Sequence, residues 1–182
     1  MARFRALLVG DKVVVPSIED SRALYSMGFY GKPIGVDKVR DPSSISSPLV
    51  LDAYEAVYLA ETGAIEVAGP DGRALDAAEL RRRLGVAEGP GPYEVYRDLR
   101  SSGLVVRSGL KYGAAFLAYR RGPGLEHAPF IVHYVDPREK IDPVELVMAG
   151  RVGHSVRKTF VMATIDEGAG RPVYLMLKWF KP

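Results

Sequence analysis

The chain of 182 residues contains no cysteine, which excludes disulfide bonds, thiolate metal sites and nucleophilic cysteine chemistry. Long apolar runs are also lacking. Runs such as residues 130–135 and 173–177 have the length of a strand and fall far short of the ~20 residues that cross a bilayer. No small-residue cleavage site follows the short apolar run at residues 6–9, so we expect no secretory signal. The sequence predicts a folded cytoplasmic protein with no membrane partner.

Several catalytic patterns are missing as well. The sequence has no nucleotide-binding glycine motif, no Ser-His-Asp arrangement and no cluster of carboxylates that would hold a metal. We therefore expect neither a cofactor nor a metal site.

The positive charge of the chain is concentrated in its second half. Residues 1–92 carry 11 Lys and Arg against 13 Asp and Glu, whereas residues 93–182 carry 14 against 9. A surplus of this sign attracts polyanions and makes their binding dependent on salt. Charge alone favours the simpler interpretation of an ordinary solvated surface.

Residues 86–92, VAEGPGP, form a stretch that is dense in glycine and proline and has no periodicity, as is typical of a linker. The sequence therefore predicts an N-terminal mixed domain at 1–85 and a second domain at 93–182. We expect the following elements in the first domain: strands at 4–9, 12–15 and 64–67, and helices that begin after Ser17, Asp52 and Asp76. We expect residues 31–48 to form a long surface loop.

The second domain is predicted to begin with a helix that ends at Gly103. Strands are predicted at 104–106, 110–119, 130–135, 159–165 and 173–180. The stretch 110–119 has small or apolar residues on both faces, which a sheet covered on both sides requires. A further helix should start at Asp142-Pro143, with Val144, Val147, Met148 and Val152 facing the core, and end near His154.

Tyr119, His127 and Lys158 lie on three separate predicted elements of this domain. Metal-free cleavage of an RNA phosphodiester needs a group to take the 2′-hydroxyl proton, a group to protonate the leaving 5′-oxygen, and a cation beside the phosphorane. One residue of each kind is present. His127 lies on a predicted loop, whereas His133 lies inside a strand and His154 near a helix end.

Five stretches carry a resemblance to one family. They are YRDLRSSGLVVRSGLKYGAAFLAY (96–119), HAPFIV (127–132), RVGHSVRK (151–158), LYSMGFYGKP (24–33) and LVLDAYEAVYLAETGAIEV (49–67). Together they resemble the archaeal tRNA-splicing endonucleases, also called tRNA-intron lyases, over nearly the whole chain.

The resemblance implies an α/β (α+β) fold: a small mixed N-terminal domain and a C-terminal restriction-endonuclease-like domain whose central mixed sheet is flanked by helices. It implies metal-independent cleavage of a bulge-helix-bulge RNA fold in precursor tRNA, with 2′,3′-cyclic phosphate and 5′-hydroxyl ends. By the same resemblance Tyr119 is the general base, His127 the general acid and Lys158 the transition-state cation.

The resemblance also suggests residues outside the chemistry. Arg151 and Arg171 match arginines that sandwich a bulged base, by stacking that does not depend on sequence. Lys38 and Arg40 would belong to an extra RNA-facing loop. Asp166 and Glu167, in a predicted hairpin turn, match an acidic loop that enters a basic cleft of a neighbouring subunit.

Some alternatives stay open at this stage. A free phenol with a pKa of about 10 is a poor base, so Tyr119 either needs nearby cations or only positions the 2′-hydroxyl. The active assembly is a homo-oligomer or, as the loop around Lys38 favours, a heterotetramer with a structural chain. Rival functions are a non-catalytic RNA-binding subunit and a metal-dependent restriction-like DNA nuclease. The adjacent Glu139 and Lys140 do not fit the Glu-x-Lys pairing usual in the latter.

Overall fold

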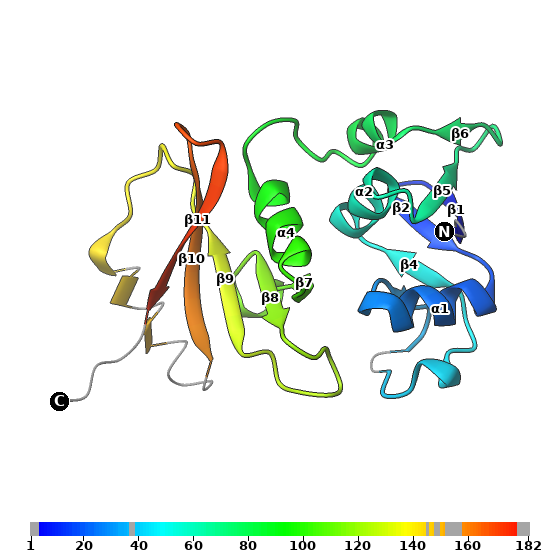
Figure 1. Ribbon diagram of the computed structural model, residues 1–182, viewed down its shortest axis with the longest axis horizontal. Helices are drawn as coiled ribbons and strands as arrows, with labels where there is room; N and C mark the ends of the chain where they lie inside the picture. Colours follow the sequence, from blue (N-terminus) through cyan, green and yellow to red (C-terminus); the bar gives the residue numbers. More distant parts are fainter. Residues whose placement is uncertain (1–3, 37–38, 145, 148–149, 152–157, 178–182) are drawn as a thin grey trace. The chain divides into compact units, whose positions relative to one another are not determined.

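A computed structural model describes residues 4–36, 39–144, 146–147, 150–151 and 158–177. The chain divides into two compact units, Met1–Glu88 and Gly89–Pro182 (Figure 1). Each unit has its own sheet, and the two are described separately below.

The first unit is a six-stranded sheet with the strand order β3-β4-β2-β1-β5-β6. Its strands are β1 (Phe4–Val9), β2 (Lys12–Val15), β3 (Lys32–Pro33), β4 (Leu49–Leu51), β5 (Ile65–Ala68) and β6 (Ala74–Leu75). Its helices are α1 (Ile18–Gly28), the 3-10 turn η1 (Pro42–Ser44), α2 (Ala53–Glu61) and α3 (Ala77–Arg83). β1 and β5 run parallel, and the other pairs are antiparallel.

The three helices of this unit begin at the predicted caps. The side chains of Ser17, Asp52 and Asp76 each accept a hydrogen bond from a backbone N–H of the first helical turn, which has no partner within the helix. At α2 the Glu55 carboxylate also accepts the N–H of Asp52 at 3.1 Å and thereby completes a capping box. Short polar side chains at the right spacing thus fix where the helices start.

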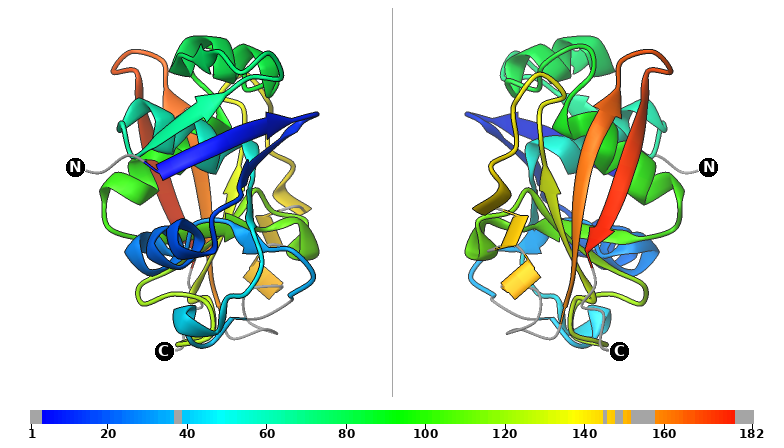
Figure 2. Two further views of the ribbon diagram at one scale, coloured as in Figure 1. Left: turned by 90° about the vertical axis from the view of Figure 1, so that its right-hand side faces the viewer. Right: turned by 90° about the vertical axis from the view of Figure 1, so that its left-hand side faces the viewer.

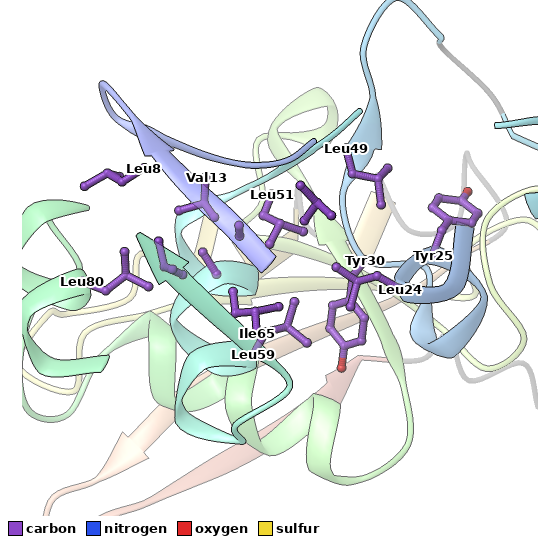
Figure 3. Packing of buried hydrophobic residues seen from close by; sticks show 14 of the residues in the cluster. Leu8, Val13, Leu24, Tyr25, Tyr30, Leu49, Leu51, Leu59, Ile65 and Leu80 are labelled. Atoms are coloured by element: carbon purple, nitrogen blue, oxygen red, sulfur yellow. The ribbon is translucent and has the colours of Figure 1, made fainter. Parts of the chain in front are cut away.

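The core of the first unit lies between the sheet and the helices. Leu8, Val13, Leu51 and Ile65 from the strands pack with Leu24, Leu59 and Leu80 from the helices, and all are buried (Figure 3). Each buried side chain of this size contributes about 1.5–3 kcal/mol relative to exposure. The alternating strands and amphipathic helices of the sequence account for this arrangement.

The predicted loop at residues 31–48 is more ordered than its composition suggests. It contains β3, which pairs with β4, and the 3-10 turn η1. Ile45 is buried, and the Arg22 side chain donates to its carbonyl oxygen at 2.8 Å. An isolated Ile between polar residues gave no periodic signal, so the sequence did not predict this anchor.

Two of the three consecutive arginines at the end of α3 make contacts within the first unit. Arg81 donates twice to the carbonyl oxygen of Ala87, at 3.1 and 2.6 Å, and Arg83 pairs with Glu79 at 2.9 Å. Arg82 is exposed. Arg81 therefore ties the chain that follows α3 to the helix itself.

The second unit is a five-stranded sheet with the order β11-β10-β9-β8-β7. It begins with α4 (Pro92–Ser101) and continues with β7 (Val105–Ser108), the 3-10 turn η2 (Leu110–Tyr112), β8 (Phe116–Tyr119), β9 (Phe130–Tyr134), β10 (Thr159–Asp166) and β11 (Arg171–Leu177). Figure 2 shows β10 and β11 side by side as a long hairpin. β9 and β10 are parallel and the remaining pairs are antiparallel, so the sheet is mixed.

The single strand predicted at 110–119 is wrong in its first half. Residues 110–112 form η2, and β8 starts only at Phe116. Gly113 adopts φ 64, which favours glycine, and a Cβ at Gly109 would lie 2.8 Å from the backbone of Phe116. The two glycines allow the chain to turn back sharply between β7 and β8.

The sheet of the second unit is covered on both faces. On one face α4 packs Tyr96 against Phe116, with ring centroids 5.9 Å apart, and Asp98 accepts a 2.7 Å hydrogen bond from the Tyr174 hydroxyl. The opposite face carries a cluster of Ala114, Ile131, Phe160 and Met162, against which Leu146 packs. Burial and this hydrogen bond raise the pKa of Tyr174, so its hydroxyl stays a donor.

Part of the helix predicted after Asp142 faces the opposite way from our expectation. Residues 143, 144, 146, 147, 150 and 151 are helical, but Val144 and Val147 are exposed and Leu146 contacts the sheet. Met148, Val152 and His154 lie outside the described residues. The helix carries apolar residues on more than one side, so its sequence did not determine which side is buried.

The fold class is confirmed. Both units combine a mixed sheet with helices, and in the second unit helices and turns cover both faces of the sheet. The predicted α/β (α+β) architecture therefore describes the chain.

Candidate active site

Three strand ends meet at one edge of the second sheet. Because β8 is antiparallel to β9 and β9 is parallel to β10, the C-terminal end of β8 lies beside the N-terminal ends of β9 and β10. The register aligns Ala118, Phe130 and Thr159 in one row across the strands. Tyr119 and Lys158 each stand one residue beyond this row, at the edge.

Tyr119 and Lys158 share a face of the sheet as well as an edge. Successive side chains of a strand alternate between faces, so two residues that are each one step beyond an aligned row point to the same side. Their strands are separated by β9 alone, which places the two backbones about 10 Å apart, twice the usual spacing of ~4.8 Å. Long side chains can converge on a shared ligand from that separation.

The ammonium group of Lys158 is held by two contacts. Its Nζ donates to the carbonyl oxygen of Ala128 at 2.6 Å and lies 5.8 Å from the centre of the Tyr112 ring. A carbonyl oxygen and an aromatic face both attract a cation. Lys158 is half-buried, so its charge has a defined position before any ligand arrives.

His127 lies directly before the carbonyl group that holds Lys158. Ala128 is buried, and the N–H of Thr159 donates to the carbonyl oxygen of Pro129 at 2.8 Å. These contacts fasten the backbone after His127 to the start of β10. The imidazole side chain itself is exposed, as a group that must reach a substrate has to be.

The loop at residues 120–126 returns the chain from β8 to β9 within a few residues. The N–H groups of Leu125 and Glu126 both donate to the carbonyl oxygen of Gly122 at 3.2 Å, and the Glu126 Oε1 atom accepts the N–H of Arg121 at 2.6 Å. Arg120 places its guanidinium 5.0 Å from the Phe130 ring centre. The loop is therefore a closed turn that keeps Tyr119 and His127 at the same sheet edge.

The predicted catalytic residues thus come together at one place. The residues that carry a phenol, an imidazole and an ammonium group lie at the edge where β8 ends and β9 and β10 begin. Such a set can accept a proton, donate a proton and stabilise negative charge. Lys158 supplies positive charge on the face of the sheet to which Tyr119 belongs, whereas the Arg120 guanidinium is turned to the Phe130 ring.

The other predicted site residues lie elsewhere. Arg151 is helical and exposed, and Arg171 opens β11 opposite Asp166, at the far end of β10 from Lys158. Eight residues of strand separate these two ends, about 25 Å. Arg40 is exposed in the first unit, and Lys38 lies outside the described residues.

The turn between β10 and β11 uses its two carboxylates differently. Asp166 Oδ1 accepts the N–H groups of Gly168 at 2.9 Å and Ala169 at 3.0 Å, and the Asp166 carbonyl oxygen accepts the N–H of Gly170 at 2.7 Å. Glu167 is exposed. Asp166 therefore shapes the turn, and Glu167 is the carboxylate it presents.

Two residues of this edge were not singled out in the sequence. Tyr112 contributes the ring beneath Lys158, and Glu126 closes the loop before His127. Tyr112 is 46 positions from Lys158, and nothing in a single sequence links the two. Glu126 offered the weak signal of a carboxylate that directly precedes the candidate acid.

Neither a candidate metal centre nor a membrane-spanning helix is present in the described residues. Within that part of the chain, no group of three or more His, Asp or Glu side chains is placed to hold a metal ion. No described helix is both long and apolar enough to cross a membrane.

Comparison with known proteins gives a consistent answer for both units. The family model described as "tRNA intron endonuclease, catalytic C-terminal domain" matches residues 91–170, and "tRNA intron endonuclease, N-terminal domain" matches residues 4–81. A tRNA-splicing endonuclease of Saccharolobus solfataricus is 49% identical over 179 residues, which cover 97% of this chain and 98% of the relative. One from Hyperthermus butylicus is 49% identical over 183 residues, with coverages of 98% and 99%.

A tRNA-splicing endonuclease of Saccharolobus islandicus is 48% identical over 97% of this chain and 98% of its own length. The family models match both units, and these relatives resemble the chain over nearly its whole length. The chain is a nuclease that belongs to the tRNA-intron endonuclease family.

Proposed function

We propose that this endonuclease excises introns from precursor tRNA by cutting a bulge-helix-bulge fold through metal-independent transesterification. The observation that carries the proposal is the meeting of Tyr119, His127 and Lys158 at one sheet edge. These three groups suffice for attack by a 2′-hydroxyl. Because precursor tRNA is the substrate, we also place the enzyme in the cytoplasm.

In the proposed reaction the RNA loses one proton from a 2′-hydroxyl group and gains one proton on the leaving 5′-oxygen. Tyr119, in its phenolate form, accepts the proton of the 2′-hydroxyl, whose oxygen attacks the adjacent phosphorus, and it is left as the neutral phenol. The bond from phosphorus to the 5′-oxygen breaks, and His127 donates a proton to that oxygen. Lys158 balances the negative charge that builds up on the non-bridging oxygens. The products are a 2′,3′-cyclic phosphate and a 5′-hydroxyl.

The most direct test maps the ends of the products. The purified chain, alone and with any structural partner chain, is incubated with an intron-bearing transcript in EDTA. We expect cleavage to persist and to leave a 2′,3′-cyclic phosphate. Strict dependence on Mg²⁺, or a 3′-hydroxyl product, would contradict the mechanism. Failure to cut in every combination would instead favour a non-catalytic RNA-binding subunit.

The RNA contacts we propose lie on both units. Arg151 is exposed on the unit that carries the site and is available to stack on a bulged base. Arg171 stands about 25 Å from Lys158 along β10, so we propose that it serves the site of another subunit. Lys38 and Arg40 are proposed to contact the RNA from the first domain, 1–85, which residues 86–92 link to the catalytic domain, 93–182.

We propose that the β10–β11 turn joins subunits into the active assembly, a homo-oligomer or a heterotetramer with a structural chain. Basic domains repel one another unless an anionic element lies between them. Glu167 is exposed at this turn in the more basic half of the chain. The carboxylate of Asp166 adds charge but is engaged with two backbone N–H groups of its own turn.

Asp166→Asn combined with Glu167→Gln is expected to shift the assembly to smaller species and to lower cleavage about 10-fold or more. The asparagine keeps a side-chain oxygen for the two turn N–H groups, so the double variant removes charge without breaking the turn. Light scattering, with any partner chain present, gives the mass of the assembly.

Glu19→Gln combined with Glu88→Gln removes the same charge from exposed positions of the first unit and should leave the mass unchanged. If the double variant of the turn kept the same mass and the same activity, the turn would be an ordinary solvated turn with no role in assembly.

A further inference from the structure

The loop that separates the proposed base from the proposed acid is only seven residues long, from Arg120 to Glu126. It connects the end of β8 to His127, and its last residue is Glu126. A loop on the surface of a domain is ordinarily its most mobile part. For a base and an acid to act on opposite sides of one phosphate, however, their relative position has to be held closely.

One carboxylate provides the closure. The Oε1 atom of Glu126 accepts the backbone N–H of Arg121 at 2.6 Å, and the N–H groups of Arg120 and Gly122 also face this carboxylate. These hydrogen bonds, that of Arg121 first, lower the pKa of Glu126, so its carboxyl group is ionised near neutral pH. Charge-assisted bonds to N–H groups are roughly twice as strong as neutral ones.

The Glu126 carboxylate and the N–H groups that face it stand at opposite ends of the loop between Tyr119 and His127. The three N–H groups follow Tyr119 directly, and the carboxylate belongs to the residue directly before His127. The hydrogen bond from the Arg121 N–H to the Glu126 carboxylate therefore closes the stretch of chain between the two proposed catalytic residues. A second contact, of the Arg120 guanidinium with the Phe130 ring at 5.0 Å, fixes the first residue of the loop to the start of β9.

We propose that Glu126 is a positioning residue for cleavage: by closing the 120–126 loop on itself, its carboxylate holds His127 at the correct distance from Tyr119. The inference rests on the proposed roles of those two residues. Glu126 touches neither the RNA nor the reacting atoms in this proposal. Its contribution belongs to the chemical step and not to substrate binding.

Glu126→Ala is expected to slow single-turnover cleavage about 10- to 30-fold, because misplacement by a fraction of an ångström weakens proton transfer. Affinity for a transcript with 2′-deoxyribose at the cleavage sites, which cannot react, should change less than about 3-fold. Glu126→Gln keeps an oxygen that can accept the Arg121 N–H, so its rate should return to within about 3-fold of the wild type. The pH profile of the Gln variant should match that of the wild type.

Two controls separate the possible explanations. Glu139→Ala removes a negative charge from an exposed position of the same unit and should cleave at the wild-type rate. Circular dichroism and the melting temperature report whether the Ala variant is folded. If it is not, the comparison of Glu126→Gln with the wild type still decides between hydrogen bonding and charge.

The outcomes that overturn the proposal differ from those that overturn the proposed function. A folded Glu126→Ala with the wild-type rate, beside an impaired His127→Ala, would refute the positioning role alone. A Gln variant as slow as the Ala variant and with a displaced pH profile would show that the charge of Glu126 acts on the titrating groups and not through the loop closure. Full activity of both His127→Ala and Tyr119→Phe would instead refute the catalytic roles on which the inference rests.

Discussion

His127→Ala is expected to lower the single-turnover cleavage rate by a factor of about 100 or more while RNA affinity changes little. General acid catalysis typically contributes about 10²–10⁴ in rate. His127 is exposed beside the sheet edge, and the backbone that follows it is fastened to the start of β10. Its loss therefore removes the proton donor and leaves the fold in place.

A change in the leaving group tests whether the histidine acts as the acid. With sulfur in place of the 5′-oxygen at the splice site, the leaving thiolate has a far lower proton affinity than an alkoxide and needs no protonation. We expect the difference between the wild type and His127→Ala to shrink to less than about 5-fold on this substrate. A difference that persists would show that His127 acts in another way.

His133→Ala is the matched control. His133 is half-buried on β9, with its ring centre 6.1 Å from that of Phe160, on the strand that His127 precedes. It should cleave both substrates at rates close to the wild type once its fold has been verified. Equal damage by this variant would mean that His127 was the wrong choice.

Most elements of the fold could be predicted because local chemistry determines them. The caps Ser17, Asp52 and Asp76 start helices where they were expected, and the Gly10 turn between β1 and β2 has the positive φ that its sequence suggested. Such signals act over three or four residues. A single sequence is sufficient to read them.

The failures occur where tertiary contacts decide. Which of the described helical residues after Asp142 is buried depends on how Leu146 meets the sheet, although Val144 is also apolar. The break at residues 109–113 depends on the close approach of Gly109 to Phe116 in the folded chain. Neither contact leaves a periodic pattern in the sequence.

The same distinction applies to the site. Tyr119, His127 and Lys158 could be found because they stand in motifs that resemble a family. The groups that hold Lys158 could not, because the Ala128 carbonyl oxygen belongs to the backbone and the Tyr112 ring reaches Lys158 only through the fold. Motifs in the sequence indicate the candidate residues, and only the folded chain reveals the groups that contact them.

Lys158→Met is expected to reduce the cleavage rate about 100- to 1000-fold. Methionine keeps an unbranched apolar side chain but removes the charge proposed to balance the phosphorane, and the loss of one such stabilising donor typically costs about 10²–10³ in rate. RNA affinity should fall only a few-fold, because one phosphate contact is lost. Lys140→Met, at an exposed position of the same unit, is the matched control and should leave the rate unchanged.

The sulfur-containing substrate separates this role from that of the histidine. Negative charge gathers on the non-bridging oxygens whatever the leaving group is, so the Lys158→Met defect should persist where the His127→Ala defect shrinks. Tyr112→Leu should give a smaller loss of about 5-fold, since a cation–π contact contributes roughly 1 kcal/mol, and Tyr112→Phe should restore the rate. If both the Lys158 and the His127 variants recovered on sulfur, Lys158 would act on the leaving group, and the assignment of the cation would have to change.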